Sequence, residues 1–559
     1  MEIQNGWNAV DQAKTPIVIN AQGPSFSALD YITTMAEMPL IDHEDQSWEL
    51  EDPDMMATIE DWVLVFNSLS SQPVRLSYDG DNLIKNFFHQ PAGFRLILCA
   101  FAAFNSNLPP SLQLSYYNRA RKALIRAINE KPTHQTVQAL QSVFVFAEAK
   151  GQPDLGHSLF QTAINMIVTM RLDIDPDDSP WLYHLNLTER QKEDRRRAFW
   201  GCYIVLVTEQ ALSPTNFSET RLSADKIKAP ATIMDPHLVF QGNCLVKPEC
   251  ELFRMIATFR QQYSLAPRNI AEVINGLPTV AMELESIIST IPSTHLLTPD
   301  SIAGLTHNDY YRFLRQFGQM SVAEISSTFT VNFAAPTSNC VLHRPQLQLA
   351  ACKSCHPMFI GSIEQNVIVL AIQKCLDAAN QIAYLYTFLE DIKYGAYKDC
   401  IPEDRKIHFE LGEDTGIYML FEATTVFWFV LCRMNPIWWQ LAGRNVPEWS
   451  ELRPRIVQMI HFVKKVESEG GMADGCCVPL ILTLNAMLNE MDSCMNGGME
   501  ENIDKILVGM KVLSLDAGIA VAVKEPRAFL GLLGLEVGGG VQWMGRVEES
   551  WRLFWKVYG

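Results

Sequence analysis

The fold of this chain is decided by the stretch from Thr133 to Ala211, which contains the sequence Glu193-Asp-Arg-Arg-Arg-Ala-Phe-Trp-Gly-Cys-Tyr203. The stretch predicts three consecutive helices. Thr133 can cap the first helix, and Asp154 can cap the second after a break at Lys150-Gly-Gln-Pro153. The third helix follows a capping box, Thr188-Glu-Arg-Gln191, and continues to Ala211.

Apolar side chains in the first two helices recur at steps of three and four, so each helix presents one face to a core. These faces contain Val137, Leu140, Phe144 and Ala147, then Leu155, Leu159, Ala163, Met166 and Met170. The helical period continues from Ile59 to the C-terminus, and no alternation of period two is long enough to make a sheet. The sequence therefore predicts an all-α, multi-helix fold of stacked helical pairs.

Further helices are expected on both sides of this stretch. A long core helix is predicted at 362–392, capped by Ser362 with Gln365 three residues on, and an all-round apolar helix is predicted at 417–432. Residues 222–230 are expected to form a loop. The remaining predicted helices cover residues 62–69, 82–89, 93–104, 115–129, 249–265, 269–291, 455–469, 479–491, 501–513 and 541–558.

The composition is that of a folded, acidic protein. Of 559 residues, 48% are hydrophobic, and the net charge is −18 with a pI near 5.2. This charge disfavours attachment to nucleic acid or anionic lipid, because such affinity comes largely from Lys and Arg. Thirteen cysteines scattered through apolar segments indicate reduced thiols, and neither a secretory leader nor a membrane-length apolar run occurs. We therefore expect a soluble intracellular protein that does not enter membranes.

Residues 1–58 are expected to form a disordered acidic arm. Within it, an acidic segment that starts at Asp42 holds Trp48, Leu50, Met55 and Met56 among its carboxylates. Acidic segments with interspersed aromatic residues occur in transcriptional activation regions. A solvated terminus without a recruiting function has the same composition and is the favoured interpretation.

Several short motifs, in this order along the chain, resemble the regulatory domain of fungal transcription factors. Within the opening stretch these are Gln135-Thr-Val-Gln-Ala-Leu140, Met170-Arg-Leu-Asp-Ile-Asp175 and Asp194-Arg-Arg-Arg-Ala-Phe-Trp200. Outside it they are Phe87-Phe-His89, Tyr116-Tyr-Asn-Arg-Ala120, the loop-like Leu342-His-Arg-Pro345 and Lys374-Cys-Leu-Asp-Ala-Ala379. The resemblance covers residues 80 to 440.

The resemblance implies a helical regulatory domain at 59–450, with further helices at 451–559 packing on the same domain. The family-signature residues that it marks as structural are Arg195, Arg196, Arg197, Phe199, Trp200, Tyr203, His343, Arg344, Pro345 and Cys375. Two positions depart from the family pattern. Leu206 replaces a common aspartate, and Ser213-Pro-Thr215 stands where Gly-Arg-Pro is usual.

A six-cysteine binuclear zinc cluster normally accompanies this regulatory domain. Its spacing, C-x2-C-x6-C followed by C-x2-C and a last cysteine, does not precede the domain, since the first cysteine is Cys99. No basic leucine zipper or two-Cys two-His finger replaces it. The sequence predicts a regulator without its own DNA-binding domain, which is either a natural co-regulator or the product of an incomplete gene model.

Candidate metal and ligand sites each have a plainer alternative. Cys340, His343, Cys352, Cys355 and His356 offer zinc ligands, but their spacing is short for a finger and packing at a helix end is favoured. The aromatic segments Phe427-Trp-Phe429 and Trp438-Trp439 are expected in the core, with the lining of a small-molecule cavity as the alternative.

The run Arg195-Arg-Arg197 is assigned a structural role, with a nuclear-import signal as the alternative. Its three side chains should point in different directions on a helix. Arg196 is expected to stack on Trp200, four residues on, and Glu193 is expected to pair with Arg197.

The sequence contains none of the following common catalytic motifs. No H-E-x-x-H, G-x-S-x-G, P-loop or kinase set occurs, and Gly531-Leu-Leu-Gly534 is interpreted as a flexible turn. We therefore expect no enzyme, no cofactor and no catalytic metal.

The sequence favours a nuclear transcriptional regulator that acts through a DNA-binding partner, or as a homodimer or heterodimer. A small-molecule effector is possible, and the resemblance implies control of a metabolic or secondary-metabolite gene cluster. The alternative is a helical small-molecule sensor or scaffold that kept the fold without DNA targeting.

Overall fold

A computed structural model describes the following residues: 52–70, 80–130, 133–149, 153–212, 217, 220–235, 238–240, 243–262, 273–274, 277–300, 304–320, 322–351, 355–400, 413–470, 484–485, 487–489, 491–492 and 494–495. The predicted helices at 501–513 and 541–558, most of 479–491, and residues 1–51 of the predicted arm lie outside these ranges. Helices dominate the described residues, which confirms the predicted all-α fold.

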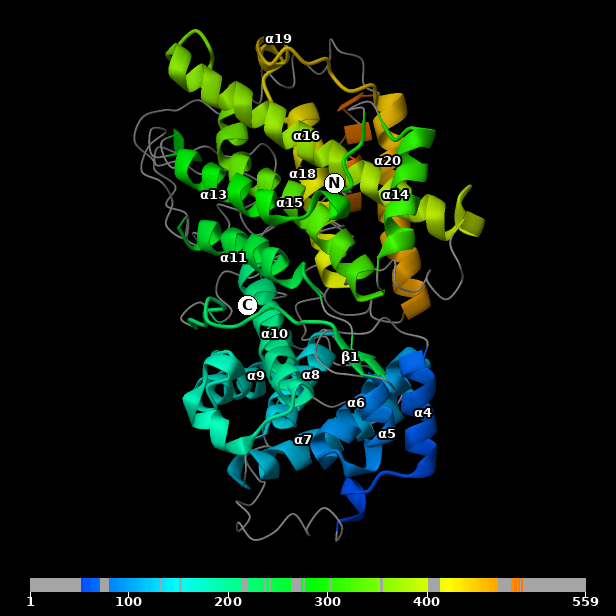
Figure 1. Cartoon of the computed structure of the whole chain (residues 1–559). Coiled ribbons are helices and arrows are strands. Elements are labelled where there is room, and N and C mark those ends of the chain that lie inside the picture. The colour runs from blue at the N-terminus through cyan, green and yellow to red at the C-terminus, as the bar shows by residue number, and fades with distance from the viewer. Residues whose placement is uncertain are drawn as a thin grey trace.

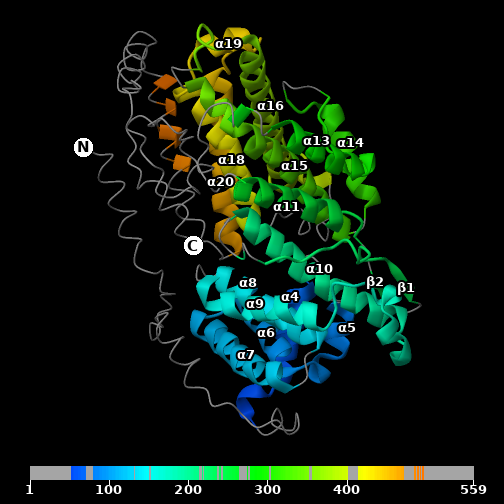
Figure 2. The same cartoon turned by 90° about the vertical axis from the view of Figure 1, so that its left-hand side faces the viewer.

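The first part of the described chain is a set of antiparallel helices, coloured blue to cyan in Figures 1 and 2. Its longest pairs are α6 with α7 and α8 with α9, and Phe146 of α8 is surrounded by Phe101, Phe104 and Tyr117 of α6 and α7. The elements are η1 (Pro53–Met55), α4 (Ile59–Ser70), α5 (Gly80–Lys85), η2 (Phe87–His89), α6 (Ala92–Asn105), α7 (Pro110–Glu130), α8 (His134–Ala149) and α9 (Pro153–Thr169).

The described residues include the end of the predicted arm, from Asp52 onward. Asp52 caps η1, and its carboxylate lies 3.1 Å from Nζ of Lys122 on α7. Met55 is fully buried in the core. The last residues of the predicted arm, 52–58, therefore pack against the helices.

Helix α10 (Glu189–Leu212) runs between the two ends of the molecule, below α11 and above α8 in Figure 1. Its capping box is confirmed, because Thr188 N–H donates to Gln191 Oε1 at 2.9 Å and Gln191 N–H donates to Thr188 Oγ1 at 3.2 Å. The short helices η3 (Pro176–Asp178) and η4 (Pro180–Leu185) precede it. Helix α10 packs on α8 on one side and on α11 (Val246–Gln262) on the other.

The second part of the described chain is a bundle around α15 (Val322–Gln348) and α16 (Ser362–Lys393), coloured green to orange in Figures 1 and 2. Helix α18 (Glu413–Cys432) packs on both, as the predicted buried apolar helix should. The other elements are α13 (Leu277–Thr290), η5 (Ser293–His295), α14 (His307–Gln319), η6 (Leu349–Ala351), η8 (Lys398–Cys400), α19 (Ile437–Leu441) and α20 (Trp449–Gly470).

Two predicted helices start earlier than their expected caps imply, α9 by two residues and α16 by one. Helix α9 begins at Pro153, so Asp154 lies inside its first turn and is not its cap. Helix α16 begins at Ser362 with Gly361 at the cap position and no side-chain cap. Proline is favourable at the first helical position, which explains the earlier start of α9. Thr133, by contrast, accepts a hydrogen bond from Thr136 N–H at 3.2 Å, as predicted.

The segment Leu342-His-Arg-Pro345 is not a loop, because it lies inside α15, which also contains Pro336. Proline removes one backbone hydrogen bond and usually breaks a helix. Here residues 340–350 are all buried, so packing on every side holds the helix together. Tertiary contacts therefore outweigh the local tendency of proline to break the helix.

One two-stranded antiparallel sheet departs from the purely helical expectation. Strands β1 (Ile233–Asp235) and β2 (Leu238–Phe240) pair in the register Ile233 with Phe240 and Asp235 with Leu238. The hairpin lies beside the end of the blue to cyan part in Figures 1 and 2. Three residues per strand are too few for a period of two to be recognised in the sequence.

The buried side chains of both parts form one continuous hydrophobic core. Phe427, Trp428 and Trp438 are fully buried in it, which agrees with the expectation that this aromatic segment belongs to the core. Among the described helices, none combines the length and the apolar character needed to cross a lipid bilayer.

Candidate functional site

The three signature arginines lie in the first half of α10 and reach different neighbours. Arg196 donates from Nε and Nη2 to the carboxylate of Asp175 at 2.9 and 2.8 Å, and from Nη2 to Asp177 at 2.9 Å. Arg195 donates to the carbonyl oxygen of Met170 at 3.2 Å. The bonds to Met170 and Asp175 join α10 to the segment between α9 and η3, and the bond to Asp177 joins it to η3 itself.

The pair between Glu193 and Arg197 is confirmed, with 3.4 Å between Oε1 and Nε. The predicted stacking of Arg196 on Trp200 is wrong, because the Arg196 guanidinium is directed at the carboxylates of Asp175 and Asp177 instead. Charge-assisted, bidentate bonds to carboxylate are stronger than a ring contact, which explains the choice.

Asp177 forms ion pairs with three basic side chains, those of Lys192, Arg196 and Lys228. Hydrogen bonds from Lys192 Nζ at 2.8 Å and Lys228 Nζ at 2.7 Å lower the pKa of Asp177, and the charge of Arg196 adds to the effect. Burial would raise the pKa of Asp175, but the bonds from Arg196 and from the Lys228 and Asp177 N–H groups lower it overall. Both carboxylates are therefore ionised at neutral pH, and Arg196 forms an ion pair with each of them.

The aromatic signature residues of α10 are buried behind these arginines. Phe199 stacks on Tyr203 with 5.4 Å between ring centroids, and Trp200 Nε1 donates to the Lys228 carbonyl at 2.8 Å. Because Lys228 Nζ also pairs with Asp177, the segment around residue 228 is fixed to α10 by the ring nitrogen of Trp200 and to η3 by an ion pair.

The remaining signature residues lie in the second part of the molecule. Arg344 and Glu422 form a buried ion pair between α15 and α18. His343 and Pro345 are buried on the same helix, and Cys375 of α16 faces Cys340, each thiol 3.9 Å from the other residue's carbonyl oxygen. The signature residues thus form two separate groups, one on α10 and one around α15.

The candidate zinc ligands at 340–356, for which packing at a helix end was the favoured interpretation, do not form a group of three close ligands among the described residues. Cys340 and His343 are buried within α15, Cys355 is buried beyond its end, and Cys352 lies outside the described residues. Burial lowers the pKa of His343 to about 4, so its ring is neutral at pH 7. Burial also raises the pKa of Cys340, which keeps this thiol protonated.

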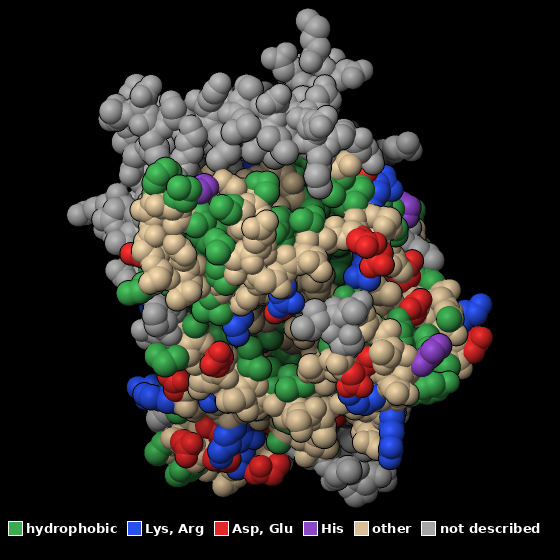
Figure 3. All heavy atoms as spheres, turned by 90° about the horizontal axis from the view of Figure 1, so that it is seen from above, with side chains coloured by type: hydrophobic (Ala, Val, Ile, Leu, Met, Phe, Trp, Pro, Cys, Tyr) green, Lys and Arg blue, Asp and Glu red, His purple; other side chains and the backbone are tan. Residues whose placement is uncertain are grey.

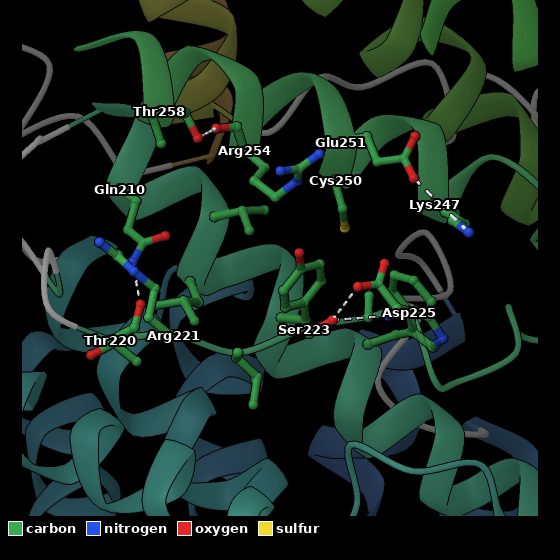
Figure 4. A pocket seen from close by; sticks show the side chains of 17 residues that line it. Gln210, Thr220, Arg221, Ser223, Asp225, Lys247, Cys250, Glu251, Arg254 and Thr258 are labelled. Carbon is green, nitrogen blue, oxygen red and sulfur yellow. Dashed lines mark hydrogen bonds and ion pairs between the residues drawn. The ribbon is translucent and has the colours of Figure 1, made fainter. Parts of the chain in front are cut away.

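A pocket of about 620 Å³ opens between α10 and α11 (Figure 4). Its apolar wall includes Trp200, Tyr203, Leu206 and Val207 of α10 and Ala257 of α11. The segment from Thr220 to Asp225 forms a second wall. A pocket of this size can hold a drug-sized molecule.

The polar side chains of the pocket carry both signs of charge. Arg221, Lys247 and Arg254 are cationic and exposed, while Asp225 and Glu251 are anionic. Figure 4 shows Lys247, Glu251 and Arg254 on α11, facing Arg221 and Asp225 from across the opening. The Lys247–Glu251 pair is long, at 4.0 Å, and Arg254 Nη2 lies 3.6 Å from Glu283 outside the pocket.

Two titratable groups deeper in the pocket stay neutral. Burial raises the pKa of Tyr203 to about 12, and burial also raises the pKa of the Cys250 thiol. Gln210 is fixed by its side-chain amide, which donates to the Phe217 and Thr220 carbonyls at 2.7 and 3.2 Å. The pocket therefore combines a neutral apolar floor with a charged rim. The rim carries three basic side chains and two acidic ones.

The sequence did not point to this pocket. A cavity lined by the aromatic residues 427–439 was only the alternative to core packing, and the structure buries their rings in the core. The available signal was the unusually polar loop at 220–225 ahead of a helix with Lys247, Glu251 and Arg254 at helical spacing. Trp200 and Tyr203 are the signature residues that line the pocket.

Residues 77–205 match the family described as "Fungal specific transcription factor domain". The matched segment ends within α10, beside the pocket. This result confirms the resemblance over residues 77–205. A curated relative, the TY1 enhancer activator of Saccharomyces cerevisiae (strain ATCC 204508 / S288c), is 34% identical over 119 residues.

The alignment with this relative covers 19% of the present chain and 15% of the relative. The chain therefore spans only a small part of the relative's length. No solved structure matches the chain.

Proposed function

We propose that this protein is a transcriptional regulator whose helical domain responds to a small molecule bound between α10 and α11. The observation that carries the proposal is the position of the pocket at the end of the matched domain, where Trp200 and Tyr203 form its wall. Helix α10 packs on the first group of helices, and α11 packs on α15 of the second. A ligand between them contacts both parts of the molecule at once.

The lining indicates an effector with an apolar body and an anionic group. The apolar surface of α10 takes the body, and Arg221, Lys247 and Arg254 at the rim attract the anion. Asp225 is held by Ser223, whose hydroxyl donates to its carboxylate at 2.7 Å. Such a fixed acid at the rim favours ligands that also carry a hydrogen-bond donor.

We expect small amphipathic carboxylates to raise the melting temperature of the protein, and their uncharged amides to raise it less. Binding to the folded state alone stabilises it, by roughly 2.7 kcal/mol at a hundredfold excess over Kd. Arg254→Gln should weaken this response, because it removes a rim cation while keeping a polar, hydrogen-bonding side chain. A thermal-shift titration with a panel of such acids measures the effect.

The matched control is Arg315→Gln, because Arg315 is exposed on α14 and does not line the pocket. An equal response of both variants to every acid would contradict the proposed site.

We further propose that promoter specificity comes from a DNA-binding partner and that the protein acts in the nucleus. The charge of −18 opposes approach to DNA, and specific readout needs side chains placed in a groove and held by phosphate contacts. Arg195, Arg196 and Arg197 are bound to neighbouring groups and do not form a basic face. On the face seen in Figure 3, the described Lys and Arg side chains are mixed with Asp and Glu.

We expect the isolated 559-residue chain not to bind DNA with sequence specificity. A gel-shift or footprinting experiment at physiological salt, with and without candidate zinc-cluster factors, measures this. Protection of a defined sequence by the lone chain would refute the dependence on a partner.

The alternative is a sensor or scaffold outside transcription, which the same pocket would also serve. Chromatin occupancy in cells separates the two functions. Occupancy at promoters that is lost when a partner is deleted supports the regulator, whereas uniform cytoplasmic location supports the sensor. Promoters of clustered metabolic genes are the first to examine, because the family resemblance suggests them.

A further inference from the structure

A cysteine, a histidine and a glutamate from three separate elements converge on the side of α15. Cys244 lies in the turn before α11, His295 is the last residue of η5, and Glu324 is in the first turn of α15. Their ligand atoms all lie within 4.8 Å of one another. No other group of three such side chains is this close among the residues that the structure describes.

The turn that contains Cys244 is anchored to α15 through the side chain of Asn243. Asn243 is buried, and its side-chain nitrogen donates to Ser327 Oγ at 2.7 Å. Its side-chain oxygen accepts from Leu245 N–H at 2.9 Å, and its own N–H donates to the Pro230 carbonyl at 3.1 Å. The turn that contains Cys244 is therefore fixed one helical turn from Glu324, and Cys244 is an exposed residue.

His295 is anchored in a similar way. The buried side chain of Asn332 on α15 donates to the His295 carbonyl at 2.6 Å and accepts from Leu297 N–H at 2.7 Å. The ring has one polar partner at each nitrogen. Nδ1 lies 3.1 Å from Thr294 Oγ1, and Nε2 lies 3.9 Å from Glu324 Oε1.

This arrangement of the histidine is the one that metal sites use. When Nδ1–H donates to the Thr294 hydroxyl, Nε2 keeps a lone pair directed toward Glu324 and Cys244. A hydrogen bond at one ring nitrogen fixes the tautomer and orientation in which the other nitrogen binds a metal.

We propose that Cys244, His295 and Glu324 bind a zinc ion, with water as the fourth ligand. Sulfur, imidazole and carboxylate are the ligand types of zinc, whereas calcium and magnesium require oxygen alone. Bonds of about 2.0–2.3 Å in a tetrahedron place ligand atoms roughly 3.3–3.8 Å apart. The side chains need to move inward by only about 1 Å, which rotamer adjustments of an exposed cysteine and a half-buried glutamate supply.

The ion would join the turn before α11, η5 and the start of α15. This site is distinct from the pocket, and it does not depend on the proposed effector. Because α11 also carries Lys247, Cys250 and Arg254 of the pocket wall, a zinc ion here fixes the start of that wall.

The test uses the purified full-length chain after removal of metal with a chelator. Zinc affinity is measured against a chromophoric chelator, and cobalt is used as a spectroscopic probe. Thiolate ligation gives cobalt an intense near-ultraviolet charge-transfer band, and a tetrahedral site gives strong visible bands. We expect both signatures in the wild-type protein, and we expect zinc to raise its melting temperature.

Cys244→Ser should abolish the charge-transfer band and weaken zinc binding by more than about 100-fold, since changes outside the ligand shell alone cost roughly 10–100-fold. Glu324→Gln should weaken binding at least tenfold while keeping the band. Cys400→Ser is the matched control, because Cys400 is also an exposed free cysteine, and it should behave as wild type.

Circular dichroism and the melting temperature of the metal-free variants establish that they fold. If Cys244→Ser does not fold, Glu324→Gln decides the question. Failure of the wild-type chain to bind zinc, or equal affinity in Cys244→Ser and Cys400→Ser, would overturn the proposal, because any bound metal would then be held by other cysteines.

Discussion

Trp200→Ala should lower the free energy of unfolding by roughly 3–5 kcal/mol, the usual cost of truncating a buried large aromatic side chain. Trp200 is fully buried, and its ring packs edge-on against Phe199 and Tyr203. Its Nε1 also donates to the Lys228 carbonyl, which loses this partner in the variant. Urea denaturation followed by circular dichroism measures the difference.

Phe199→Ala should cost a similar amount, because Phe199 is fully buried and stacks on Tyr203. Phe359→Ala is the matched control, since Phe359 is 75% exposed and its truncation should change stability by less than about 0.5 kcal/mol. A Phe199 or Trp200 variant that unfolds like wild type but loses activity would instead place that residue in a binding surface. Trp200 lines the pocket, so this outcome is a real alternative for it.

The helices around α10 were predictable because their ends are marked by local chemistry. Thr133 and the Thr188–Gln191 box cap helices through bonds between residues three apart, and such bonds can be read from spacing. The apolar faces of α8 and α9 follow the helical period for the same reason. Elements fixed by neighbours in sequence are therefore recovered from sequence.

Contacts between distant segments were not predictable in the same way. From its spacing along the helix, Arg196 was expected to stack on the ring of Trp200. In the structure its guanidinium instead donates hydrogen bonds to Asp175, which is 21 residues away in the sequence. The Leu342-His-Arg-Pro345 segment was expected to be loop-like, but it is helical. Proline disfavours a helix interior, and burial on all sides keeps the segment helical. In both cases the deciding partner comes from another part of the chain.

The pocket and the Cys244–His295–Glu324 cluster were missed for a related reason. Each draws its residues from segments that are separated in sequence and carry no common motif, such as the loop at 220–225 with α11, or η5 with α15. Spacing rules recognise ligands on one helix or one turn. Only the packing of α11 between α10 and α15 brings these side chains together.

Arg344→Met should lower the free energy of unfolding by about 3–5 kcal/mol, because it leaves a buried carboxylate without its partner. The side chains of Arg344 and Glu422 are 3% and 1% exposed, so water cannot replace the lost interaction. Methionine keeps the volume and the straight shape of the arginine stem, which limits the cavity that the change creates. The decrease in the free energy of unfolding should therefore come mainly from the buried carboxylate of Glu422 that has lost its ion-pair partner.

The double variant Arg344→Met with Glu422→Leu separates the charge effect from a packing effect. Replacing both partners of a buried ion pair by apolar side chains is often neutral or stabilising, because the cost of removing two charges from water disappears. We therefore expect the double variant to recover most of the stability that Arg344→Met alone loses. If the losses of unfolding free energy from the two single substitutions simply add in the double variant, the destabilisation comes from altered packing and not from an unpaired charge. If the double variant recovers, the buried pair chiefly fixes how α15 and α18 pack against each other, and its two charges are compatible with the core only as a pair.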